Sequence, residues 1–333
     1  MNYRKSFQRT IATGKLTLPF ALLVMLVSWA ATFMLIPELT HNTDDTLLSA
    51  WIEQLHIPGW LNRLISLSIH LIIGYFLIAF NNAFVIIRIR ASVQTTIYFL
   101  FIAIFPALHQ FHSANVLTVF FIIALYFFFR SYQQSAPTGS LFYSFFFLGL
   151  GSMLFPQLIF FIPLFIIGIP YLSTLTWRIF FATLLGFILP YFFLLGHAVY
   201  HDSMELFYKP FVQLIHFDAI DFSLLPTWEL VTLCYFFFLF VCSTIHCLAE
   251  SYKDKIRTRI LLRFWIVICF FMFVFIVLQP AHIISLTSIL LTGLSVLIAH
   301  FATQTNSKLS NLFFIGSALA LLFIYGYNIW MLL

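Results

Sequence analysis

The chain alternates between long apolar runs and short polar connections. About eleven runs approach the roughly 20 apolar residues that a bilayer-spanning helix needs. Their continuity favours helices, because barrel strands alternate polar and apolar positions over about 10 residues. The pattern predicts an all-α integral membrane protein with about 11 transmembrane helices, in a range of roughly 10 to 12. The expected helices cover residues 16–36, 61–87, 95–108, 114–129, 141–155, 158–171, 177–199, 228–248, 260–278, 283–301 and 312–332.

Two stretches depart from simple crossings. Residues 141–171 contain three prolines and form either a tilted pair of helices or a partly re-entrant hairpin, because freed backbone groups need partners inside the membrane. Residues 47–55 (LLSAWIEQL) have apolar positions at helical spacing, which predicts a short helix lying in the interface.

No linker or repeat divides the chain, so residues 1–333 are expected to form a single polytopic membrane domain. The most basic connection, at 249–263, is a candidate seam. It would separate a core at 16–248 from a trailing helical bundle at 260–333.

Composition excludes a water-soluble protein of this size, because 62% of residues are hydrophobic and only 8% are charged. The net charge of +5 comes from residues that anchor helices at the membrane, so no nucleic acid is expected as a partner. The four cysteines lie inside predicted helices without a CxxC pair and are interpreted as reduced packing residues. No metal ligand is assigned. The first apolar run lacks a small-residue cleavage site and is interpreted as helix one.

The charges follow the connections in alternation. All 16 Lys and Arg residues except Arg63 and Lys209 fall in or beside every second connection, and nine of the 11 acidic residues fall in the others. The positive-inside rule then places the N-terminus in the cytoplasm of a bacterium, with the chain in its inner membrane. With 11 helices the C-terminus would lie outside.

The first outer connection carries Glu38, Asp44 and Asp45 just after the first predicted helix. A carboxylate above an interfacial helix can act as a general base on a sugar hydroxyl, or hold a divalent cation beside a lipid phosphate. The alternative is structural, since Asp44 and Asp45 are also good caps for the helix at 47–55.

Candidate ligands for a lipid phosphate are few on the outer face. Arg63 and Lys209 are its only permanent positive charges, and His109 and His112 bracket one tight turn. A histidine can donate to a phosphate, although histidines also anchor helix ends at the interface. Apart from His70, ionisable residues are scarce within the expected spans, and no Asp, Glu, Lys or Arg lies near mid-span, which argues against an ion-coupled transporter.

Residues 16–200 resemble the GT-C superfamily of glycosyltransferases, which use lipid-phosphate sugars. The resemblance rests on the first helix, the acidic outer connection and the interfacial helix. It continues in IAIFPALHQFHSANVLTVFFIIALYFFFR (102–130), a helix ending near a proline, a short turn and a helix closing on a basic residue. It ends in GSLFYSFFFLGLGSMLFPQLIFFIPLF (139–165), a glycine-containing helix leading into an apolar one.

The resemblance implies that the acid after the first helix is the catalytic base, which carries over to Asp44, Asp45 or Glu38. The chain departs from the pattern in two places. Residues 112–115 (HSAN) lack the second acid, and residues 155–157 (FPQ) lack the basic residue that often follows the glycine helix. The whole chain also resembles an uncharacterised bacterial family of Phe-rich multi-pass membrane proteins.

Three functions follow as hypotheses. The first is a GT-C-like protein that acts on, or binds, a polyprenyl-phosphate-linked glycan at the outer membrane face. The second is a non-enzymatic scaffold or assembly subunit of a cell-envelope complex. The third is a lipid or glycan flippase with a polar path along Asn81, Asn82 and Asn115. The expected partners are membrane lipid, a polyprenyl-phosphate-linked sugar and an envelope protein, and the only cofactor considered is a divalent cation.

Overall fold

The structure is a computed structural model that describes residues 14–36, 58–88, 92–215, 222, 225–305 and 307–333. Helices make up all the regular structure of these residues, which confirms the all-α class. Eight helices are long and apolar enough to cross a membrane, and three shorter apolar helices occupy the positions of the third, fifth and sixth expected spans. The chain therefore has the architecture of a multi-pass membrane protein.

The helix boundaries follow the apolar runs closely, and the seventh expected span, 177–199, is the helix Trp177–Tyr200. The long helices are α2 (Thr17–Leu35), α4 (Gly59–Phe84), α6 (Ser113–Arg130), α9 (Trp177–Tyr200), α11 (Thr227–Ala249), α12 (Ile256–Leu278), α13 (Ile283–Gln304) and α14 (Lys308–Leu332). The shorter elements are α5 (Val93–Ala103), η1 (Pro106–His109), α7 (Thr138–Leu154), η2 (Pro156–Phe161), α8 (Ile162–Leu172), α10 (Glu205–Ile215), η4 (Ser251–Lys253) and η5 (Pro280–His282).

Helix α13 forms the centre of the bundle and is buried along nearly its whole length. It packs against α5, α6, α11 and α12. Several of its hydroxyl side chains have partners inside the protein: Ser288 meets Thr118 of α6 at 2.6 Å, and Thr292 and Ser295 donate to backbone carbonyls of their own helix. The packing of α13 joins helices from both sides of the candidate seam at 249–263, and whether the two sides fold separately stays a prediction.

Helices α7 and α9 make the closest pairing, and glycine permits it. A Cβ at Gly149 would lie 2.7 Å from the carbonyl oxygen of Phe187, and one at Gly186 would lie 2.5 Å from that of Phe142. Small residues let helix backbones approach in this way inside membranes. Residues 141–171 form α7, η2 and α8, with the helix broken at Phe155 and Pro156.

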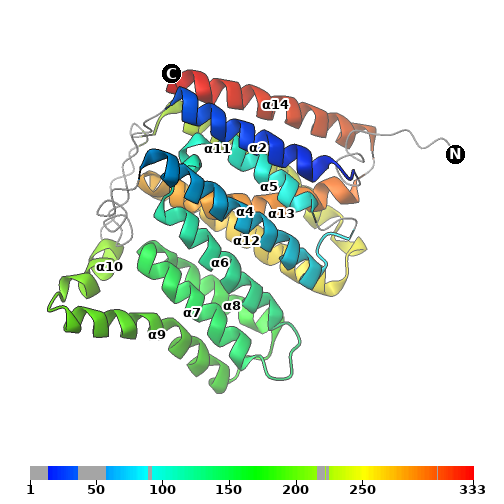
Figure 1. Cartoon of the computed structure of the whole chain (residues 1–333). Coiled ribbons are helices and arrows are strands. Elements are labelled where there is room, and N and C mark those ends of the chain that lie inside the picture. The colour runs from blue at the N-terminus through cyan, green and yellow to red at the C-terminus, as the bar shows by residue number, and fades with distance from the viewer. Residues whose placement is uncertain (1–13, 37–57, 89–91, 216–221, 223–224, 306) are drawn as a thin grey trace.

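Most basic residues lie in or beside a set of connections that gather at one end of the bundle, here named the basic end (Figure 1). They join α4 to α5, α6 to α7, α8 to α9, α11 to α12 and α13 to α14. Helix α10 and the C-terminus lie at the opposite end, here named the α10 end (Figure 1). The interfacial helix expected at 47–55 lies outside the described residues.

Candidate functional site

The α10 end contains a polar cluster built around a helix that stops early. Helix α5 ends at Ala103 rather than at Leu108, because Pro106 cannot continue its hydrogen bonding. Backbone carbonyls freed at membrane depth need donors inside the protein. Side chains from α2, α4, α14 and η1 supply them. The contacts are Ser28 with the carbonyl of Ala103 (2.6 Å), Asn328 with Ile104 (2.7 Å), Ser66 with Leu108 (2.8 Å) and His109 with Ile102 (3.1 Å).

His109 lies at the centre of this cluster and is completely buried. Its Nδ1 lies 2.8 Å from the Thr32 hydroxyl, its Nε2 contacts the Ile102 carbonyl, and its ring stacks on Trp29 with 3.8 Å between centroids. Both ring nitrogens are thus engaged by protein atoms rather than offered to a phosphate.

A second histidine adds to the same cluster. His70 of α4 places Nδ1 2.8 Å from the Tyr98 hydroxyl and Nε2 3.4 Å from the Asn115 amide, which also donates to Ser66. His112 is half-buried and is the N-cap residue of α6, where its backbone N–H donates to Asn115 Oδ1 at 3.3 Å. Of the two predicted histidines, His112 is the more accessible.

Arg63 is a buried charged residue at the α10 end. It lies in the second turn of α4, only 4% exposed, and its guanidinium donates to the carbonyl of Ile36, the last described residue before 37–57. The guanidinium also lies over the Phe33 ring, 5.4 Å from its centroid. The positive charge therefore lies beside the C-terminal end of α2, after which the acidic connection begins in the sequence.

The other predicted site residues lie apart or outside the described residues. Glu38, Asp44 and Asp45 all fall in 37–57, outside the described residues. Lys209 is a half-exposed residue of α10, which packs on α9 and η2 on the side of the bundle away from α2 (Figure 1). The structure thus does not bring Lys209 beside Arg63.

One buried acid at the α10 end was not singled out as a site from the sequence. Glu229 lies in the first turn of α11 and is completely buried. Its neighbour Trp228 packs against Phe105 with 5.6 Å between ring centroids, close to the break in α5. In the sequence Glu229 lies at the edge of the expected span 228–248, and this position shows nothing of the packing.

The asparagines of the flippase hypothesis do not line one path. Asn81 bonds through both side-chain atoms to Ile87 and closes the basic end of α4. Asn115 belongs to the cluster at the α10 end, and Asn82 is exposed on the bundle surface. Because Asn81 and Asn115 serve opposite ends, these residues do not support a polar route through the bundle.

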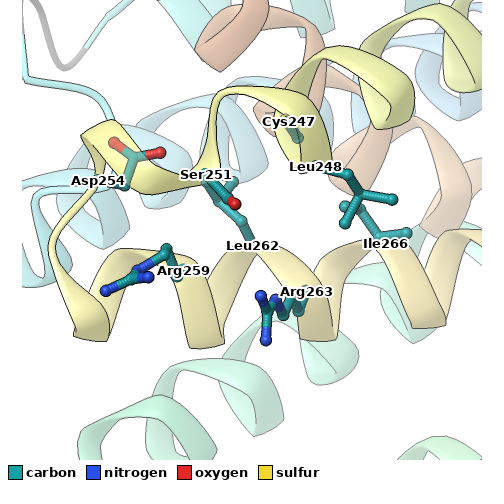
Figure 2. A pocket seen from close by; sticks show the side chains of 8 residues that line it. All are labelled: Cys247, Leu248, Ser251, Asp254, Arg259, Leu262, Arg263 and Ile266. Carbon is teal, nitrogen blue, oxygen red and sulfur yellow. The ribbon is translucent and has the colours of Figure 1, made fainter.

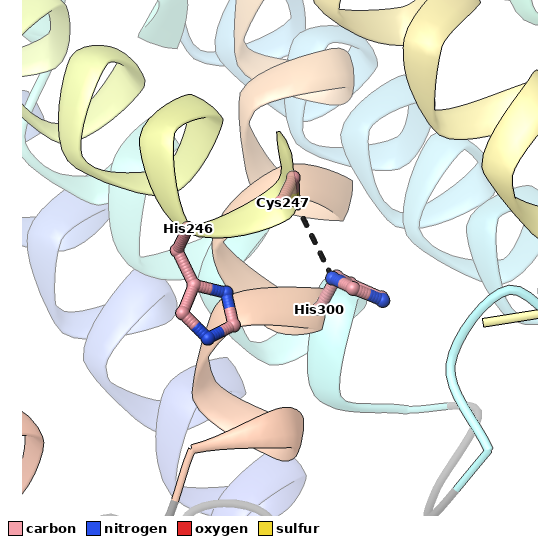
Figure 3. Close-up of side chains that lie close together, drawn as sticks. All are labelled: His246, Cys247 and His300. Atoms are coloured by element: carbon pink, nitrogen blue, oxygen red, sulfur yellow. Dashed lines mark hydrogen bonds between the residues drawn. The ribbon is translucent and has the colours of Figure 1, made fainter. Parts of the chain in front are cut away.

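A second polar cluster lies at the basic end, and sequence reasoning missed it. Asp254 Oδ2 is 3.0 Å from Nε2 of His300, whose Nδ1 is 3.4 Å from Sγ of Cys247. Arg88 contacts the other Asp254 oxygen at 3.3 Å. His246 stands beside Cys247 on α11 (Figure 3). No sequence signal joins them, because His300 belongs to another helix and follows Cys247 by 53 residues.

Comparisons of the chain with family models, with curated proteins and with solved structures give no match.

Proposed function

We propose that this chain is an inner-membrane protein that binds a polyprenyl-phosphate-linked glycan at its α10 end. The proposal includes about 11 crossings, a cytoplasmic N-terminus and an external C-terminus. The gathering of basic connections at one end of the bundle supports this orientation (Figure 1). The α10 end is then the outer face.

The observation that carries the proposal is the place of Arg63. Its guanidinium contacts Ile36, two residues before Glu38 and a few residues before Asp44 and Asp45. A guanidinium matches the geometry of a phosphate and presents several donors, so it can hold a backbone carbonyl and a phosphate together. A low-dielectric setting strengthens that attraction.

The arrangement would support glycosyl transfer as GT-C enzymes perform it. A carboxylate of Asp44 or Asp45 takes the proton of an acceptor hydroxyl, and the hydroxyl oxygen attacks the anomeric carbon of the sugar. The bond from that carbon to the phosphate oxygen breaks, and the electron pair leaves with the polyprenyl phosphate. Arg63 then neutralises the charge that develops on the phosphate.

The buried cluster below Arg63 supports this function by positioning it. Trp29 donates from its indole to the carbonyl of Arg63 at 3.3 Å and stacks on His109, which Thr32 holds in turn. A charged side chain binds its ligand best when packing and hydrogen bonds hold the residues that position it. The polar cluster is therefore assigned to the scaffold of the site.

Native mass spectrometry of the detergent-purified protein tests the proposal. We expect the wild type to retain a polyprenyl-phosphate lipid, and both Arg63→Gln and the Asp44→Ala/Asp45→Ala double variant to retain much less. Arg178→Gln is the matched control, since it removes an exposed positive charge at the other end of the bundle. Equal lipid retention by wild type and Arg63→Gln would refute the site, and absence of lipid from the wild type would favour the scaffold hypothesis.

A further inference from the structure

The C-terminal ends of α11 and α13 bring three metal-binding side chains together (Figure 3). The ligand atoms of His246, Cys247 and His300 all lie within 4.8 Å of one another. Cys247 and His300 are buried, and neither ring nitrogen of His246 has a hydrogen-bond partner in the described structure. Buried polar atoms normally have partners, so this imidazole indicates a ligand.

The spacing of Cys247 and His300 fits tetrahedral coordination. With metal–sulfur and metal–nitrogen bonds of about 2.3 and 2.0–2.1 Å, tetrahedral angles separate the two ligand atoms by roughly 3.5 Å. The observed distance from Cys247 Sγ to His300 Nδ1 is 3.4 Å. One edge of the coordination polyhedron is thus already formed, and a rotation of the His246 side chain would complete a three-residue set.

Asp254 stands behind His300 in the position that metal sites use to fix an imidazole. Its Oδ2 is 3.0 Å from His300 Nε2, within reach of an N–H on that nitrogen. With the proton on Nε2, the lone pair of Nδ1 faces Cys247. Arg88 contacts the second carboxylate oxygen of Asp254 at 3.3 Å, which holds the carboxylate in place.

We propose that His246, Cys247 and His300 bind one divalent transition-metal ion of the zinc type at the basic end, with Asp254 orienting His300. One thiolate and two imidazoles favour zinc over magnesium or calcium, which prefer oxygen ligands. Binding replaces the S–H bond of Cys247 by a sulfur–metal bond and releases the proton to water. The ion links α11 to α13, the central helix.

A small pocket lies beside Cys247 (Figure 2). It has a volume of about 10 Å³, room for a single water molecule. Its lining includes Ser251, Asp254, Arg259 and Arg263, and neither His246 nor His300. The pocket is therefore not assigned to the proposed ion, whose protein ligands are the three side chains of Figure 3.

Cobalt(II) titration of the full-length protein in detergent, after removal of metal with a chelator, tests the site. We expect a thiolate-to-cobalt charge-transfer absorption that saturates at one ion per chain and disappears when Zn²⁺ is added. Cys247→Ser should abolish the absorption. Cys234→Ser is the matched control, because Cys234 is an exposed cysteine of the same helix, and it should leave the absorption unchanged.

Two further variants keep the test decisive if Cys247→Ser fails to fold. Asp254→Asn should keep the absorption but weaken cobalt binding by about 10- to 100-fold, as changes behind a ligating histidine do. His246→Gln alters a half-buried side chain and should also weaken binding, with gel filtration confirming the fold. Absence of the absorption from the folded wild type, or its persistence in folded Cys247→Ser, would overturn the proposal.

Discussion

The packing of α9 on α7 gives a sharp prediction about Gly186. A Cβ at this position would lie 2.5 Å from the carbonyl oxygen of Phe142, about 0.9 Å closer than the 3.4 Å at which ordinary contacts begin. The obstructing atom belongs to a helix backbone and cannot rotate away as the end of a side chain can. Gly186→Ala therefore requires α9 and α7 to separate.

The magnitude follows from opposing terms. Overpacking of a close contact costs about 1–3 kcal/mol, while replacing a helical glycine by alanine contributes up to about 1 kcal/mol in the other direction. We expect Gly186→Ala to lower the free energy of unfolding by about 1–2 kcal/mol. Gly196 lies on the same helix with nothing within 4 Å of its Cβ position, so Gly196→Ala should be neutral or stabilising.

Unfolding in mixed micelles, with increasing SDS and helical circular dichroism as the readout, measures this difference. The two variants make the same chemical change on the same helix, so effects of micelle and helix propensity cancel between them. Equal unfolding midpoints for Gly186→Ala and Gly196→Ala would refute the close-contact argument, as would a Gly186→Ala variant more stable than wild type.

Two more predictions concern stability. Burial alone would raise the pKa of Asp254, but contact with His300 and the charge of Arg88 outweigh it and hold that pKa below its usual value. Because the pKa of this carboxyl is lower in the folded chain than in the unfolded chain, the ionised group stabilises the fold at pH values above its unfolded-chain pKa. That stability is lost as the pH falls below about 4. The wild-type unfolding midpoint should therefore drop there, and Asp254→Asn should show less of this loss. Asn328→Ala removes hydrogen bonds of 2.7 Å to the Ile104 carbonyl and 3.0 Å to Thr232. It should lower the free energy of unfolding in the SDS assay by about 1 kcal/mol. An unchanged midpoint would show that α14 is held by apolar packing alone.

The helices could be predicted from the sequence because the bilayer leaves the backbone few alternatives. An apolar run such as 177–199 satisfies its own hydrogen bonds only as a helix, and its observed bounds, Trp177–Tyr200, differ by one residue. The early end of α5 at Ala103 was not predicted, because the apolar pattern continues to Leu108. The break is stabilised by distant donors such as Asn328, which periodicity cannot show.

The sequence shows which residue types are available for a site, but it does not show which of them lie together in the fold. The sequence identified Arg63 as a rare outer-face charge, but its contact with Ile36 depends on how α2 and α4 pack. The sequence placed Cys247 inside a helix and assigned it to packing, since the cysteine pattern contains no metal motif. Its neighbour His300 comes from the central helix, and tertiary packing alone brings the two within 3.4 Å.

The two ends of the bundle use buried polar groups differently, and this difference separates scaffold from site. At the α10 end, His109 has both nitrogens engaged by Thr32 and the Ile102 carbonyl, so the end of α5 accounts for its presence. At the basic end, the described residues contain no broken helix that accounts for His246, and among them its buried nitrogens have no hydrogen-bond partner beside a thiol and a second imidazole. An imidazole that the fold does not use is the stronger indication of a ligand. The metal proposal therefore rests on what packing leaves unsatisfied, and the glycan proposal rests on where packing places the Arg63 charge.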